Sequence, residues 1–257
     1  MKKKLYAIFL SALLCVSCVF NESLDVNAKS NVEGENITFN VKGSVHANFY
    51  LTNNVAVGIV PEKTCYKIVV HNSGFDSIDS ITLNARVTKD NGSYLKSSSK
   101  TLKNVKVGNT TWTWNTQKGE TVQEHITVSL TGYDGGETYV GSGSTVRYNF
   151  AGGKYGTMKA YDGQKHHMPS ASVDGLSDYK GAALRMLTSE HKKTASYGSS
   201  TSAKNFRKKE KKLVDEGKFL QAQKLGISDV QSKFGTKYDT ALVDMVAYTI
   251  KELGYKK

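Results

Sequence analysis

The spacing of hydrophobic positions indicates strands in the first half of the chain. Between residues 37 and 150, apolar and polar positions alternate, most clearly over residues 81–87 and 126–130, as in strands with one buried face. Turn-forming residues separate these runs. The strongest turn signal is Asp90-Asn91-Gly92, because Asn and Gly tolerate positive φ. Several short strands separated by turns predict an all-β sandwich over about residues 30–150.

The period changes after Gly163. Apolar positions then follow helical spacing over residues 202–216, 227–234 and 236–253. In the last of these segments, Thr236 and Asp239 resemble a capping box at the start of the helix. Together with the glycine-rich stretch at residues 132–163, the change predicts an α+β chain whose second, α-rich domain covers about residues 155–257.

The first 28 residues read as a secretory signal peptide. Three lysines precede a mostly apolar run from Leu5 to Phe20, and a small-residue pattern ends at Ala28. The run is shorter than the roughly 20 residues that span a bilayer, so the sequence favours cleavage over a membrane anchor or lipidation at Cys18. We therefore expect a secreted protein whose one remaining cysteine, Cys65, forms no internal disulfide.

Positive charge is concentrated in the second half. Residues 154–257 contain 20 Lys and Arg against 11 Asp and Glu, whereas residues 29–153 contain 12 against 10. Such an excess suggests a polyanionic partner such as nucleic acid, although a solvated lysine-rich surface remains the alternative. The residues expected to contact phosphate are Arg185, Lys204, Arg207, Lys208, Lys209, Lys211 and Lys212.

Three histidines form the sharpest chemical feature. His166 and His167 are adjacent, and neighbouring residues on an extended segment point to opposite sides. One can therefore hold a metal while the other faces a substrate. His191 follows the apolar stretch at residues 182–187. The expected order is a strand with two histidines, a loop, a second strand, and a helix that presents the third histidine.

This order resembles the ββα-metal nucleases of the HNH/endonuclease VII superfamily. The segments His-His-Met-Pro-Ser-Ala-Ser-Val, Lys-Gly-Ala-Ala-Leu and Glu-His-Lys-Lys-Thr-Ala-Ser-Tyr-Gly-Ser-Ser resemble the double-His toxin nucleases. Those domains lie at the C-termini of bacterial polymorphic toxins, and the resemblance covers about residues 160–253. The asparagine that the HNH motif would place near residues 181–183 is absent.

The resemblance implies a role for each histidine. His166 and His191 would bind one divalent metal ion, Mg²⁺ or Zn²⁺, and His167 would be the general base. Imidazole, with an ordinary pKa near 6.5, suits proton abstraction near neutral pH. The substrate would be DNA or RNA, and an immunity protein is a further possible partner. Candidates for a third metal ligand, none supported by spacing, are Asp162, Asp174 and Glu190.

Three functions are therefore compared. The first is an exported nuclease, either a toxin effector or a scavenging enzyme. The second is a secreted or cell-surface binding protein that acts through the sandwich, with Trp112 and Trp114 as a sugar-binding face and a non-catalytic C-terminal domain. The third is a metal-binding protein without catalysis.

Overall fold

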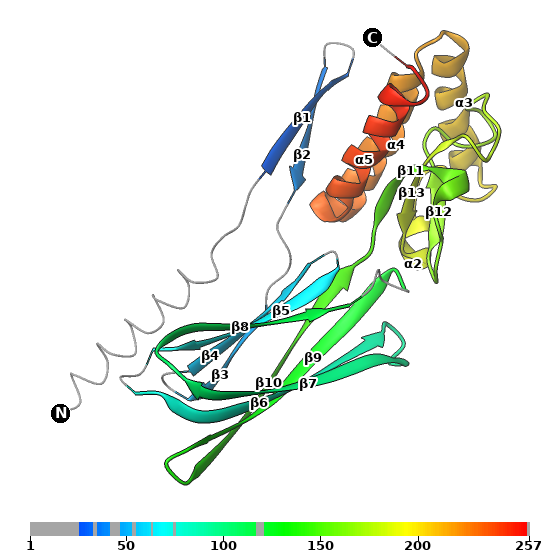
Figure 1. Cartoon of the computed structure of the whole chain (residues 1–257). Helices are drawn as coiled ribbons and strands as arrows, with labels where there is room; N and C mark the ends of the chain where they lie inside the picture. Colours follow the sequence, from blue (N-terminus) through cyan, green and yellow to red (C-terminus); the bar gives the residue numbers. More distant parts are fainter. Residues whose placement is uncertain are drawn as a thin grey trace, which may run out of the picture. The chain divides into compact units, whose positions relative to one another are not determined.

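The computed structural model describes residues 26–32, 35–41, 47–52, 55–62, 64–73, 76–116 and 121–255. These residues form two compact units (Figure 1). Unit 1 comprises residues 43–119 and 123–149, and unit 2 comprises residues 24–42, 120–122 and 150–257. The predicted signal peptide lies almost entirely outside the described residues, as does Cys18.

Unit 1 contains two antiparallel four-stranded sheets. One sheet has the order β3 (Ala47–Thr52), β4 (Val55–Pro61), β5 (Cys65–Asn72) and β8 (Gly108–Asn115). The other has the order β10 (Glu137–Tyr148), β9 (Gln123–Asp134), β6 (Ile78–Lys89) and β7 (Tyr94–Val105). The turn predicted at Asp90-Asn91-Gly92 is confirmed: it joins β6 to β7, and Gly92 has a φ of 81°.

The two sheets of unit 1 share one hydrophobic core. Ile59 and Ile68 from the first sheet and Leu83 from the second are completely buried in the same cluster. Trp112 and Trp114 stack with ring centroids 6.1 Å apart and pack against this core. Alternating apolar residues thus produce a sandwich-like unit, as the sequence pattern predicts.

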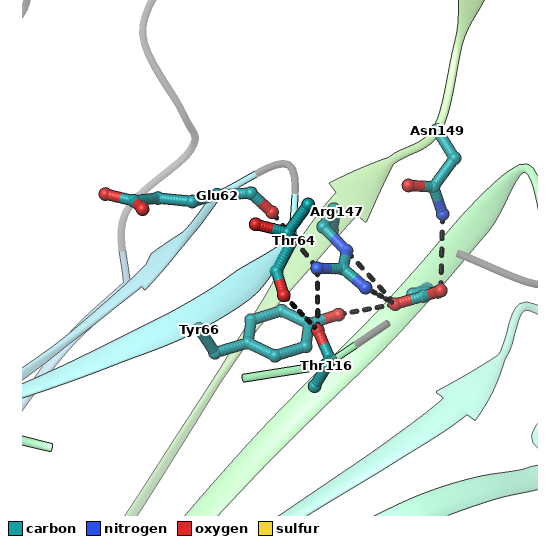
Figure 2. A network of polar contacts seen from close by, with 7 residues as sticks. Glu62, Thr64, Tyr66, Thr116, Arg147 and Asn149 are labelled. Carbon is teal, nitrogen blue, oxygen red and sulfur yellow. Dashed lines mark hydrogen bonds and ion pairs between the residues drawn. The ribbon is translucent and has the colours of Figure 1, made fainter. Parts of the chain in front are cut away.

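A buried ion pair joins two strands of unit 1 (Figure 2). Arg147 of β10 donates from Nε and Nη2 to Glu124 Oε2 of β9, at 3.1 and 2.6 Å. Tyr66 of β5 donates its hydroxyl to the same oxygen at 2.7 Å, and the Arg147 guanidinium lies 4.3 Å from the Tyr66 ring centroid. The charged side chains are 4% and 0% exposed, so this network links both sheets away from water.

Unit 2 combines a small sheet with helices (Figure 1). Its three-stranded antiparallel sheet has the order β11 (Ala151–Lys154), β13 (Ala182–Met186) and β12 (Gln164–His167). A separate hairpin pairs β1 (Val26–Val32) with β2 (Glu35–Val41). The helical elements are η1 (Tyr155–Thr157), α2 (Thr188–His191), α3 (Thr201–Asp215), α4 (Phe219–Phe234), η2 (Gly235–Tyr238) and α5 (Asp239–Lys251).

The core of unit 2 lies between the sheet and two helices. Leu184 of β13, Val230 of α4 and Met245 of α5 are completely buried in one cluster. At Gly152, an added Cβ would lie 1.7 Å from the Ala241 carbonyl oxygen. Glycine therefore lets β11 approach the backbone of α5 directly, which places the sheet firmly against the helical layer.

The two largest differences from the sequence-based boundaries are at the first strands and at α4. Residues 30–42, expected in the sandwich, are grouped with unit 2, because alternation identifies a strand but not the sheet it joins. The helix expected at residues 227–234 begins at Phe219. The first turns of α4 bury Phe219, Leu220 and also the polar residue Gln223. Because a polar residue lies on the buried side, the sequence shows no clear apolar stripe at the start of this helix. Among the described residues, no helix is long and apolar enough to cross a membrane.

Candidate functional site

Three elements of unit 2 place the histidines, and their predicted order is confirmed. In β12, His166 pairs with Leu184 of β13 and His167 pairs with Ala183. Strand β13 leads into α2, which ends at His191. His191, at the end of α2, therefore lies beside His166. His167 contacts other residues.

His166 and His191 converge. Their Nδ1 and Nε2 atoms, respectively, are 3.1 Å apart, and their ring centroids are 4.9 Å apart. The Nδ1 of His191 is hydrogen-bonded to the amide oxygen of Gln164, two residues before His166 on the same strand. Because an amide oxygen only accepts, this bond fixes the proton of His191 on Nδ1, and the lone pair on Nε2 accepts a hydrogen bond from His166 Nδ1.

Both imidazoles are neutral at neutral pH. Burial lowers the pKa of His166 to about 3, helped by the nearby charges of His191, His167 and Lys233. Burial also lowers the pKa of His191. Neutral imidazole is the form that binds metal ions.

This pair fits a divalent cation. A separation of 3.1 Å between the two nitrogens suits two ligands that each lie about 2.0–2.1 Å from one ion. The Gln164 contact matches the outer hydrogen bond that usually orients a metal-binding histidine. Within the described part of the chain, no three His, Cys, Asp or Glu side chains form a metal-binding group. The residues that could hold an ion here are the pair His166 and His191, called the two-histidine clamp below.

None of the three carboxylates considered as a third ligand joins this clamp. Asp162 accepts hydrogen bonds from the Thr121 hydroxyl and the Val122 amide. Glu190 binds Lys237 Nζ at 2.7 Å and the Tyr238 hydroxyl at 2.6 Å. Asp174 faces His167 instead. Chain spacing could not show the partners of Asp162 and Glu190, because they come from distant segments.

His167 has its own surroundings. Its ring stacks on Tyr155 with centroids 4.1 Å apart, and its Nδ1 lies 3.8 Å from Asp174 Oδ2. The side chain is 10% exposed. The two adjacent histidines therefore differ in environment, as expected for neighbours on an extended strand.

A tightly held loop adjoins His191. Tyr197 is 39% exposed, and its ring meets the His191 ring edge-on at 5.1 Å. Arg207 of α3 donates to the carbonyls on both sides of this residue, those of Ser196 and Gly198. An exposed aromatic side chain is thus fixed beside the histidine pair. Sequence reasoning missed Tyr197 and Gln164, although both lie close in sequence to the histidines.

The predicted phosphate-contacting residues fall into three groups. Lys204, Lys208, Lys209, Lys211 and Lys212 are exposed along α3. Arg207 is half-buried and holds the Tyr197 loop. The expectation for Arg185 was wrong: it is 8% exposed, donates to the Lys159 carbonyl at 2.9 Å and lies over the Tyr161 ring. All of β13 is buried because it is the central strand, so its one arginine is internal.

Glu210 is a buried carboxyl on the inner side of α3. It is 1% exposed and accepts from the Ser170 hydroxyl at 2.5 Å. Burial is the main cause that raises its pKa from 4.5 to about 7. The folded state therefore holds this proton more tightly than the unfolded state, and the associated stability is present below pH 4.5 and lost as the pH rises through 7.

Substituting glutamine for Glu210 should remove the pH dependence of stability that this carboxyl causes. Glu210→Gln keeps an acceptor for Ser170 without a buried charge. At pH 8 we expect unit 2 to gain up to about 3 kcal/mol in free energy of unfolding, and to gain little at pH 4.5. Urea unfolding at both pH values measures this, with exposed Glu252→Gln as the control. An equal change at both pH values would contradict the burial argument.

Comparison with known proteins adds little to this geometry. No protein-family model matches the chain, and no curated protein matches its sequence. Among solved structures, the chain is similar to the chicken interferon gamma receptor alpha chain, with 7% identity and a TM-score of 0.27. The match covers 37% of this chain and 50% of the receptor chain, so it spans half of that protein. A similarity at this level carries no argument about function.

Proposed function

We propose that unit 2 is a metal-dependent nuclease that hydrolyses phosphodiester bonds in nucleic acid. The observation that carries the proposal is the convergence of His166 and His191, whose nearest ring nitrogens are 3.1 Å apart, with His167 next to His166 on β12. The order of strand, strand and helix agrees with the resemblance to double-His nucleases. Secretion, and a toxin or scavenging role with or without an immunity protein, belong to the same proposal.

The histidines have separate tasks in this proposal. His166 and His191 would hold one Mg²⁺ or Zn²⁺ ion, which as a Lewis acid would stabilise the charge that develops on the phosphate. His167 would remove a proton from the attacking water at Nε2, because its other ring nitrogen faces Asp174. The lysines of α3 would attract the phosphate backbone.

Cleavage assays with and without a chelator test the proposal. The full chain is incubated with plasmid DNA or with RNA in Mg²⁺ or Zn²⁺, and parallel samples contain EDTA. We expect cleavage of at least one nucleic acid, its loss in EDTA, and recovery when excess metal is restored. His167→Ala, prepared identically, reveals contaminating nucleases. Absence of cleavage under every condition, or equal cleavage by this variant, would reject the proposal.

The exposed lysines of α3 should determine how strongly the affinity for nucleic acid depends on salt concentration. Lys211 and Lys212 pair with Asp215 and Glu216 on the next turn, so the other three lysines are the sharper target. Replacing Lys204, Lys208 and Lys209 with glutamine should weaken binding to duplex DNA. The slope of log affinity against log salt should become shallower by about 0.9 for each phosphate that the variant no longer neutralises.

A matched control removes the same charge from unit 1. Lys100, Lys103 and Lys106 are exposed on or next to β7, and their glutamine variant should retain the original slope. Binding is measured with catalytically impaired His167→Ala as the background, so that the DNA stays intact. Identical slopes for the two triple variants would show that α3 is only a solvated surface.

A binding role of unit 1 is the second candidate function. One observation favours it: a shallow groove of about 750 Å³ lies on the outer side of β6, β7 and β9. The residues that line it include Asn84, Ser97, Ser99, Thr127 and Ser129, with Arg86. Such a lining suits a polar ligand, and this role would be independent of the histidines. The alternative sugar-binding face loses support because Trp112 and Trp114 pack against the core.

A further inference from the structure

One buried polar atom near the histidine pair lacks a partner. Of the side-chain nitrogens and oxygens that the structure describes, His167 Nδ1 is the one that is buried without a hydrogen bond. Buried polar groups are almost always satisfied, so such an exception calls for a physical account. The carboxylate oxygen Asp174 Oδ2 lies 3.8 Å from this nitrogen, beyond hydrogen-bond distance but within reach of a small movement.

Asp174 is held in place from its own turn. Its side chain is 1% exposed, and its second oxygen accepts from the Leu176 amide at 2.9 Å. The Asp174 amide donates to the Ser170 carbonyl at 3.2 Å. Ser170 is in turn bound by Glu210 of α3. The Asp174 carboxylate is therefore fixed in a turn that Ser170 links to α3.

The His167 ring is fixed from its other sides. Tyr155 stacks on it, and Lys165 Nζ lies 3.5 Å from the Tyr155 ring centroid. At Gly181, an added Cβ would come within 2.4 Å of His167 Nδ1 and 3.1 Å of Asp174 Oδ2. Only glycine at this position leaves the histidine and the carboxylate free to face each other.

We propose that Asp174 is a positioning residue for the general base His167. This inference rests on the proposed function. The carboxylate selects the tautomer with hydrogen on Nδ1, which leaves the lone pair of Nε2 for the attacking water. Apo structures often have such contacts longer than in the working complex, and closing the 3.8 Å separation by about 1 Å would form a hydrogen bond.

The proton balance is simple. The water proton moves to His167 Nε2 while the water oxygen forms a bond to phosphorus, and the bond from phosphorus to the leaving oxygen breaks. That oxygen takes a proton from solvent. The Nδ1 proton stays on His167, and ionised Asp174 stabilises the imidazolium without accepting it. Asp174 is thus assigned to orientation and charge stabilisation, rather than to metal binding.

The first test observes the tautomer directly and requires no activity. In the full chain labelled with ¹⁵N-histidine, the His167 signal is identified by its loss in His167→Ala. We expect the Nδ1–H tautomer in the wild-type protein and the Nε2–H tautomer in Asp174→Asn, because the amide can donate to Nδ1. A wild-type His167 with its proton on Nε2 would overturn the inference, whether or not the variant folds.

The second test measures catalysis. Asp174→Asn should lower kcat about 10²–10³-fold while KM and metal content stay unchanged; exposed Asp178→Asn is the matched control. In a His167→Ala background, Asp174→Asn should change the rate less than about threefold, because residues that act as one unit are not additive. Equal effects in both backgrounds would overturn the inference. If the wild-type protein cleaves nothing, the proposed function fails, and the tautomer measurement still decides the assignment of Asp174.

Discussion

Alanine at His191 is expected to abolish both metal binding and nucleic-acid cleavage, and alanine at His166 should do the same. In the proposed metal centre the two nitrogens hold the ion, and the described residues provide no third His, Cys, Asp or Glu ligand. Loss of either histidine should therefore release the ion. His167→Ala should slow cleavage about 10²–10⁴-fold with its metal retained, because a base is lost rather than a ligand.

Metal analysis of the purified variants, together with cleavage rates, checks this pattern. His125→Ala is the control, since His125 lies in unit 1 and contacts Asp90 and Gln123. If His191→Ala keeps full metal and activity, the proposed metal centre is wrong. If His167→Ala loses the metal while His166→Ala keeps it, the roles of the adjacent pair are reversed.

Removing the Arg147 guanidinium should produce the largest loss of stability in unit 1. Arg147→Met leaves Glu124 without its ionic partner at a site where that side chain is 0% exposed. Breaking a buried pair in this way typically costs about 3–5 kcal/mol. Chemical denaturation followed through the unit 1 tryptophans measures the effect, and exposed Arg86→Met is the control.

A double substitution separates charge from packing. Arg147→Met combined with Glu124→Gln removes both charges, and Tyr66 can still donate to the glutamine oxygen. The double variant should recover a substantial part of the lost stability, since an uncompensated carboxylate is the main cost. No recovery would indicate that Arg147 acts through its other contacts, including Thr116 and the Glu62 carbonyl.

The sequence predicted those features that depend on local periodicity. Alternation located β6 and β9. The last helical segment was predicted to have one stripe, formed by Tyr238, Leu242, Met245, Thr249 and Leu253. The first four are completely buried, and Leu253 is half-buried beyond the end of α5. The approach of His191 to His166 was also predictable, because the strand order restricts where α2 can lie. The strands and the helix are thus predicted from short segments, whereas the histidine contact follows from the expected order of strand, strand and helix.

Features that depend on distant partners could not be predicted. The expected capping box at Thr236 and Asp239 is absent, because a 3₁₀ turn precedes α5 and Asp239 instead accepts from Gln231 of α4. Arg185 was predicted to lie on the surface because it is charged. The sequence does not reveal that β13 is the central strand of its sheet. Asp174 had no spacing relation to His167, since the path of the six-residue loop between them, rather than its length, brings the two side chains together.

The two hydrogen bonds of Arg207 limit how the sequence of α3 can change during evolution. A lysine on α3 can be exchanged for another basic residue with little effect, because only its charge and exposure matter. Arg207 donates from one nitrogen, Nη1, to the two carbonyls on either side of Tyr197, and lysine would keep the charge but lose the planar guanidinium that directs this nitrogen. Divergent copies of this domain should therefore vary freely in the number and order of their α3 lysines while retaining one arginine at this turn, so total charge is a poor guide to which substitutions are tolerated.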